Sequence, residues 1–350
     1  MVARMSLIDE LIRTGGSAIY FQRNYEVLRE VVSESLREKG LILMRLDRAL
    51  REFKWIEKFM WRALPWEEGV KPMGAFLYVP ARLKVEAPLQ MCFAVSGSEQ
   101  IVHNVVLMEE GSSATINSAC TSLGGNVLHA GYTEIYLEEG AKLSYLMLHT
   151  WNEDSRVVSK TGVVVEDEGV YTQFYTCIKS PFSLDSLSNI TLGKGAAASL
   201  STLYVAGRDS QATLSSSIEL NGEGSGGEIT ARTVATRGAR IRLPSRIVAR
   251  AAGAKGHIEC RGLQLASDSR IEAIPTLFSE HGGAQLTHEA AIGKVSEEEL
   301  SYLMSRGFNE DEAISMLVRG FLEGGIDKVP PRLKPQVEAV LSIIARKALG

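Results

Sequence analysis

Cysteine, histidine and glutamate are the side chains of this sequence best suited to chemistry. The chain has four cysteines: Cys92, Cys120, Cys177 and Cys260. A His288-Glu289 pair follows the last of them by 28 residues. Thiolate, imidazole and carboxylate groups can all bind metal ions. No two cysteines form a Cys-x-x-Cys pair, so neither a zinc knuckle nor a thioredoxin motif is indicated. On spacing alone, the commoner roles are buried small hydrophobes for the cysteines and a structural hydrogen-bonded pair for His288-Glu289.

Several other kinds of function are disfavoured by the sequence. It contains no Gly-x-x-x-x-Gly-Lys-Ser/Thr motif, so we do not expect the chain to hydrolyse ATP. Its carboxylates are scattered, mostly at turns, whereas a glycosidase needs them clustered on one face. The net charge of −4 argues against nucleic acid and against a polybasic membrane surface. Because there is neither a long apolar run nor a signal-peptide pattern at the start, we expect a cytoplasmic protein without membrane contact.

The middle of the chain is self-similar. Acidic or glycine-containing turns alternate with strand-like stretches, as in EEGSSATI, EEGAKLSYLML and TRGARIRLPSRIVA. The turn glycines, for which we expect positive φ, are Gly111, Gly140, Gly169, Gly238, Gly253 and Gly283. Their spacing fits a unit of about 15 residues, with 29 or 30 residues as two units. The pattern predicts a mainly β fold, a β-solenoid, with a β-sandwich as the alternative.

A solenoid has open ends that need covering, and both termini carry helical patterns. At the N-terminal end the pattern includes Ile8 and Leu11, Val27 to Val32, and Leu46 to Phe59. We therefore predict a helical segment over residues 1–70 and a solenoid core over 71–293.

Residues 294–350 are predicted to be helical as well. Ser296 and Asn309 are candidate N-caps, and Glu312 completes a capping box with Asn309. An apolar stripe follows, made of Ile314, Leu317, Val318 and Phe321. A last helix is expected near residues 333–348.

Four stretches of the sequence are distinctive: GAFLYVPARLKVEAPLQ, ACTSLGGNVLHAGYTEIYLEEGAKLSYLMLHTWN, IECRGLQLASDSRIEAIP and HEAAIGKVSEEELSYLMSRGFNEDEAISMLVRGF. All four resemble segments of the SufB/SufD family, the scaffold proteins of iron–sulfur cluster assembly. The last of these is the most specific, and the resemblance covers roughly residues 72–325. It implies a right-handed parallel β-helix flanked by helical segments.

The resemblance also implies roles for individual residues. SufB-like members carry His-Glu-Ala where SufD-like members typically carry His-Gly-Ala, so His288-Glu289 makes this chain SufB-like. Cys260 matches the cysteine that holds the nascent cluster, with His288 and Glu289 as further ligands of a transient cluster, expected as [4Fe-4S]. Adjacent strand residues point to opposite faces, so both can ligate only if the backbone bends there. Cys120 matches the cysteine that accepts sulfur.

The expected partners follow from the same resemblance. The C-terminal helices would dock the ABC-type ATPase SufC, with Leu317, Val318 and Phe321 as the candidate surface, although this stripe could instead pack on the β-helix. Two scaffold subunits would pair through their β-helices, as a homodimer or with a SufD-like chain. The protein would act as a scaffold, not an enzyme.

Two departures from the family pattern count against a cluster site that needs four cysteines from one chain and suit a minimal scaffold that works as a homodimer; the second departure also keeps an alternative open. The long, cysteine-containing N-terminal extension of many SufB proteins is absent, and a downstream cysteine of some members is Ser269 here. The alternative is a SufD-like structural partner that binds SufC without holding a cluster.

Overall fold

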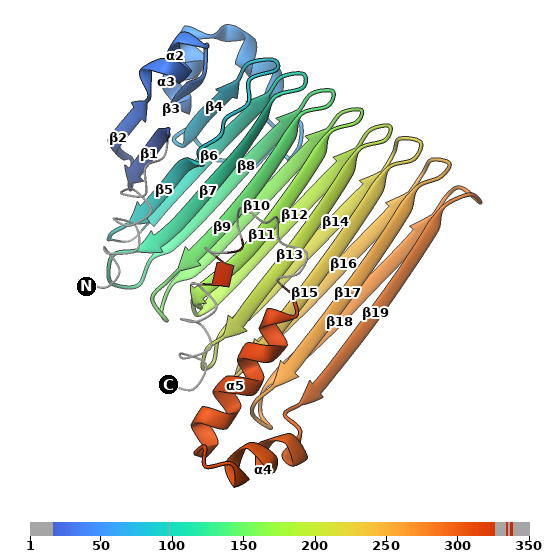
Figure 1. The fold of residues 1–350 in the computed structure, drawn as a ribbon. Helices are drawn as coiled ribbons and strands as arrows, with labels where there is room; N and C mark the ends of the chain where they lie inside the picture. The colour runs from blue at the N-terminus through green and yellow to red at the C-terminus, as the bar shows by residue number, and fades with distance from the viewer. Residues whose placement is uncertain (1–16, 98, 326–333, 335–336, 339–350) are drawn as a thin grey trace.

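The computed structural model describes residues 17–97, 99–325, 334, 337 and 338. Within these residues the chain forms a parallel β-solenoid of about eight turns (Figure 1). Short N-terminal elements lie at one end of the solenoid, and β18 and β19 form the other end. The mainly β solenoid predicted from the repeat is therefore confirmed.

Successive strands alternate between two sheets. Sheet A contains β1 (Ala18–Arg23), β2 (Glu26–Val32), β5 (Leu89–Val95), β7 (Ser113–Ser122), β9 (Lys142–Thr150), β11 (Val170–Lys179), β13 (Ala197–Ala206), β15 (Gly226–Ala235), β17 (Lys255–Gln264) and β19 (Gln285–Lys294). Sheet B contains β3 (Ile42–Arg45), β4 (Ala75–Val79), β6 (Glu99–Met108), β8 (Leu128–Leu137), β10 (Arg156–Val165), β12 (Ser183–Leu192), β14 (Gln211–Leu220), β16 (Arg240–Ala249) and β18 (Arg270–Ser279). One strand and its turn make the 15-residue unit, and two units make one coil.

Strands of neighbouring coils pair in parallel and in register, so equivalent residues stack in columns. Side chains of alternate residues point inward and form one continuous core, which includes Trp151, Tyr171 and Tyr204. Side chains of the other residues face outward on the two sheets. The column to which a residue belongs therefore decides which distant residues it can meet.

The turns explain most of the regularly spaced glycines. Gly111, Gly140 and Gly253 have φ between 62° and 67°, a region that side chains with a Cβ rarely adopt. Gly238 has φ 69° and also fits the prediction, which was wrong at Gly169 and Gly283, since neither has a positive φ. In the turn of Gly169 the preceding Glu168 takes the left-handed conformation instead, with φ 58°.

The N-terminal helical prediction was wrong in part. Val27 to Val32 lie in β2, which forms an antiparallel hairpin with β1. Its β-branched residues favour strand geometry, and β1 extends sheet A by pairing with β5. Leu46 to Phe59 are helical as predicted, in the short helices α3 (Leu46–Glu52) and η1 (Lys54–Phe59), which follow α2 (Glu34–Glu38) and β3. Ile8 and Leu11 lie outside the described residues.

A buried carboxylate fastens this N-terminal region to sheet B. Glu134 is fully buried and accepts hydrogen bonds from the backbone N–H groups of Trp61 and Ala63, at 2.7 and 2.9 Å. His103 Nε2 lies 2.9 Å from the same carboxylate, and Tyr136 Oη donates to it. Burial alone would raise the pKa of Glu134, but these hydrogen bonds hold it below its usual value.

Two helices follow the last strand within the described residues. They are α4 (Glu297–Ser305) and α5 (Glu310–Glu323). The predicted caps are confirmed: Ser296 accepts from the N–H of Glu299, and Asn309 and Glu312 form a capping box. The helix predicted near 333–348 lies mostly outside the described residues. No helix in the described part of the chain is long and apolar enough to span a bilayer.

Candidate functional site

The last two strands of sheet A carry the residues predicted to bind metal. In the pairing of β17 with β19, Ile258 stands opposite His288, Glu259 opposite Glu289, and Cys260 opposite Ala290. Cys260 and His288 thus belong to the inward-facing set, as diagonal neighbours on adjacent coils. From the strand spacing and the rise per residue, their Cα atoms are roughly 8 Å apart. Glu289 belongs to the outward-facing set.

The structure does not bring Cys260, His288 and Glu289 into one site. The strand continues without a bend through residues 285–294, so its alternation separates His288 from Glu289. Among the described residues, no group of three or more His, Cys, Asp or Glu side chains is placed to hold a metal ion. Cys260 and His288 remain on a common face, whereas Glu289 lies beside Glu259 on the other.

The thiol of Cys260 is enclosed by the core. The residue is 0% exposed, and its Sγ lies 3.6 Å from Ser245 Oγ on β16. Burial raises the pKa of Cys260, while the contact with Ser245 offsets part of that rise. His288, on the terminal strand, is exposed. Iron binds the thiolate, so metal loading at Cys260 requires loss of its proton.

Cys120, the predicted sulfur acceptor, lies in a different part of the solenoid. It points into the core from β7, beside a cavity of about 20 Å³ whose lining includes His129, Thr133 and His149. Burial raises the pKa of its thiol well above the usual value. Five coils separate β7 from β17, which places Cys120 and Cys260 roughly 24 Å apart along the solenoid axis. The two cysteines are therefore not neighbours.

A chain of polar and aromatic side chains crosses the core near Cys120. His129 Nδ1 lies 2.9 Å from Gln100 Oε1, and its ring centroid is 4.9 Å from that of Trp151. His149 contacts the same Trp151 and lies 3.2 Å from Tyr175 Oη through Nδ1. Spacing in the sequence did not indicate that His129 and His149 both contact Trp151.

The predicted docking stripe on α5 faces the solenoid. Val318 is buried and Phe321 is packed in a cluster with Leu203 and Val234 on the outer face of sheet A. Figure 1 shows α5 lying along this face. Leu317 is half-buried. The stripe therefore packs mainly within the molecule, where it covers apolar side chains on the outer face of sheet A. The exposed apolar side chains of this region are Tyr302, Met304, Phe308 and Met316.

A charged network lies under the end of α5. Arg232 on β15 donates to the carbonyl oxygen of Phe321 at 3.1 Å and to Glu259 at 3.2 Å. Arg261 lies 2.7 Å from the same Glu259 carboxylate. A guanidinium at the carbonyl end of a helix also complements the helix dipole. The network joins α5 to the residue that precedes Cys260.

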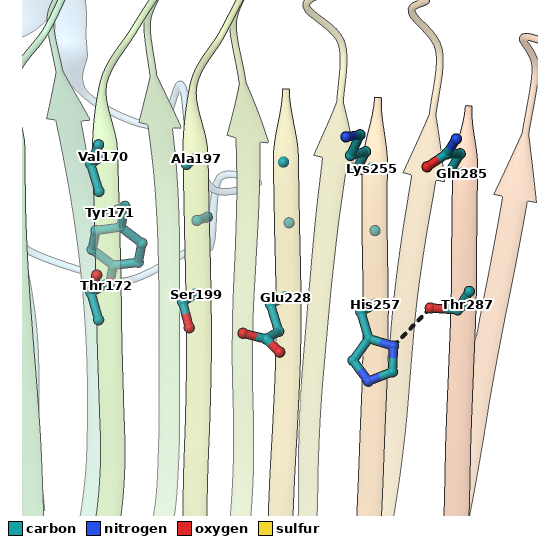
Figure 2. A pocket seen from close by; sticks show the side chains of 14 residues that line it. Val170, Tyr171, Thr172, Ala197, Ser199, Glu228, Lys255, His257, Gln285 and Thr287 are labelled. Atoms are coloured by element: carbon teal, nitrogen blue, oxygen red, sulfur yellow. Dashed lines mark hydrogen bonds between the residues drawn. The ribbon is translucent and has the colours of Figure 1, made fainter. Parts of the chain in front are cut away.

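A groove on the outer face of sheet A was not predicted. It has a volume of about 490 Å³ and lies over the first halves of β11, β13, β15, β17 and β19. Figure 2 shows Ser199, Glu228, His257 and Thr287 in one row, with His257 Nδ1 2.8 Å from Thr287 Oγ1. His257 shares β17 with Cys260 but faces the opposite side. These residues form a row only because neighbouring strands pair in register, and their spacing in the sequence did not indicate this.

Comparison with known proteins agrees with the fold and the motifs. The family model "SUF system FeS cluster assembly, SufBD core domain" matches residues 92–321. An iron-sulfur cluster assembly SufBD family protein of Archaeoglobus fulgidus is 33% identical, with 97% of this chain and 94% of the relative covered. Relatives described in the same way are 33% identical in Methanothermobacter thermautotrophicus strain Winter (87% and 78% covered) and 30% identical in Pyrococcus horikoshii (96% and 78% covered). The chain belongs to the SufBD family of iron–sulfur cluster assembly proteins.

Proposed function

We propose that this chain is the scaffold subunit of a SUF-type assembly complex, on which an iron–sulfur cluster is built and then passed on. The cluster is cargo, and the chain acts as a scaffold without turnover chemistry of its own. The observation that supports this most is the pairing of β17 with β19, which puts the Cys260 thiol and the His288 imidazole on one face at the open end of the solenoid. One thiolate with a weaker imidazole ligand suits a cluster that must leave.

A second subunit would complete the site. Within the described part, no strand pairs with the outer edges of β18 and β19. The inward-facing side chains of β19 include Leu286 and Ile292, and Ile292 is 42% exposed. An unpaired strand edge with an apolar row is suited to pairing with another chain. In a homodimer, each subunit would add its own Cys260 and His288 to the shared interface.

Control by the ATPase SufC is part of the proposal. The exposed apolar side chains of α4 and its neighbouring loop, Tyr302, Met304 and Phe308, are better placed for docking than Val318 and Phe321, which pack on sheet A. The acidic first turns of α4 and α5 flank these side chains. A movement of α4 and α5 would be transmitted through Arg232 and Glu259 to β17, which pairs with the last strand, β19.

Anaerobic reconstitution tests the ligand assignment. The wild-type protein, given ferrous iron and sulfide, should develop thiolate-to-iron charge-transfer absorption and retain iron after desalting. Cys260→Ser should lose most of this absorption, because it removes the thiolate. Cys177→Ser is the matched control, since Cys177 is equally buried but lies far from the terminal coil. An unchanged spectrum in Cys260→Ser would reject the assignment.

The alternative is a SufD-like partner that binds SufC and holds no cluster. The enclosure of Cys260 and the placement of Glu289 on the other face favour it. In that case the wild-type protein and both cysteine variants should retain equally little iron, while SufC binding should persist.

A further inference from the structure

An aromatic groove lies at the N-terminal end of the solenoid, away from the terminal coil. It consists of two adjoining cavities of about 470 and about 460 Å³ between η1 and the turns after β6, β8 and β10. Both cavities are lined by Lys58, Phe59, Tyr136 and Glu138. Volumes of this size are typical of sites that hold a ligand or a partner's side chains.

Aromatic rings form the wall of the groove around Trp55. The ring centroid of Trp55 lies 5.5 Å from that of Tyr78 and 6.3 Å from that of Phe59. Phe59 is in turn 5.2 Å from Tyr136, whose Oη lies 2.7 Å from the carbonyl oxygen of Phe59. Trp55 remains 40% exposed. The rings are thus held in fixed positions while Trp55 stays open to a ligand.

The opposite side of the groove is acidic. Its carboxylates come from three successive turns and are Glu109, Glu110, Glu138, Glu139 and Glu166. Among the described residues that line the groove, Lys58 and Arg62 are the basic ones. Burial, followed by the nearby Glu109 and Glu138, raises the pKa of Tyr78 to about 12. Acidic side chains therefore outnumber basic ones in the lining of the groove, although Glu110 is paired with Arg82 at 3.2 Å.

One cation already sits on a ring of this groove. Lys58 Nζ lies 4.9 Å from the centroid of Phe59, within the range of a cation–π contact. Trp55, the ring type that binds cations best, has no such contact among the described residues and is open to solvent.

We propose that the aromatic groove is a docking site for a basic segment of a partner protein. A lysine or arginine of that segment would stack on Trp55 and face Glu109 and Glu138, with an adjacent apolar side chain against Phe59. Rings with nearby carboxylates attract a cation that also presents apolar surface, whereas they disfavour an anionic or fully polar partner. This proposal does not depend on cluster binding at the other end of the solenoid.

Titration calorimetry with a synthetic peptide of alternating leucine and lysine tests the proposal on the full chain. The peptide should bind, and binding should weaken at high salt because the rim charges are exposed. The same peptide with acetylated lysines should not bind measurably. Trp55→Ala should weaken binding at least about threefold through loss of the cation–π contact. Glu138→Gln should also weaken it.

Matched controls exist elsewhere on the surface. Trp66→Ala removes a tryptophan that is 66% exposed and does not line the groove, and Glu223→Gln removes an exposed carboxylate from a later turn. Both controls should bind like the wild type. The proposal is overturned if the lysine peptide does not bind, if the acetylated peptide binds equally well, or if Trp55→Ala and Glu138→Gln both bind like the controls. If Trp55→Ala folds poorly, Glu138→Gln still tests the proposal, because Glu138 is exposed and its replacement should not affect folding.

Discussion

At the residue scale, the two histidines in the core are held in their neutral form. Burial lowers the pKa of His129 to about 4, and burial together with His129 lowers that of His149 to about 3. Both values lie below the pKa of about 6.5 that an unfolded chain would show. The unfolded state therefore binds more protons than the folded state as the pH falls below that value.

This difference predicts a pH dependence of stability. The stability that the neutral histidines confer is fully present above about pH 6.5 and is lost as the pH falls toward the folded values, by up to about 1.4 kcal/mol per pH unit for each histidine. Denaturant unfolding at pH 7.5, 6.5 and 5.5 measures the slope. The double variant His129→Gln, His149→Gln should show a clearly smaller loss, whereas carboxylate titration is common to both proteins. Equal slopes would contradict the prediction.

Residue types and their spacing predicted part of the site. The offset of 28 residues from Cys260 to His288 is close to two repeat units, and the pairing of β17 with β19 places the two residues on neighbouring coils. The sequence alone left open whether the strand bends at Glu289, and the straight strand places the two candidate ligands, His288 and Glu289, on opposite faces. The contact of His129 and His149 with Trp151 depends on which side chains share the interior, and this follows only from the register of several coils.

At the element scale, α5 is fixed to the solenoid by one main charged contact and an apolar cluster. Arg232 is 12% exposed at its side chain and bonds both Phe321 and Glu259. Hydrogen bonds of charged groups typically contribute about 1.5–3 kcal/mol. Its removal should loosen the end of α5 without unfolding the coils, because Arg261 still neutralises Glu259.

The variant Arg232→Met tests this contact. Amide hydrogen exchange in the last two turns of α5 should become at least about tenfold faster, in line with a loss of about 1.5 kcal/mol in local stability. Exchange in β11 and β13 should not change. Arg208→Met is the control, since the side chain of Arg208 is 72% exposed and lies on a turn. Unaltered exchange in α5 would show that the apolar cluster alone holds the helix.

Elements differed in how far the sequence predicted them. The caps of α4 and α5 are local signals, so Ser296, Asn309 and Glu312 located both helices correctly. Which surface the apolar stripe of α5 contacts depends on tertiary structure, and the stripe packs on the apolar outer face of sheet A. Val27 to Val32 fit a helical period as well as a strand, and pairing at the edge of the sheet selects the strand.

At the scale of the whole molecule, the two ends of the solenoid differ. The N-terminal end is covered by β2, β3 and the short helices, whereas β19 exposes its inward-facing side chains. The repeat predicted the stacking of coils because each unit needs its neighbours to bury its core. The expectation that the C-terminal helices cover the other end was wrong for the described residues, because α5 packs on the outer face of sheet A and leaves β19 exposed.

Pairing through this end predicts a dimer that depends on Ile292. Light scattering after size-exclusion chromatography should give twice the chain mass of 38.2 kDa for the wild type. Ile292→Lys should shift the population to monomer, because it places a charge in the apolar row. Ala291→Lys is the control, as its side chain belongs to the outward-facing set. A dimer that survives Ile292→Lys would contradict pairing through this edge.

The in-register stacking of coils also fixes how the molecule can change in length. Removing one complete coil would bring the aromatic groove and the terminal coil closer by roughly 4.8 Å and leave every other residue on its original face. Removing a single residue within a strand would move the side chains that follow in that strand to the opposite face of the sheet. The distance between the aromatic groove and the terminal coil can therefore change only in steps of one whole coil.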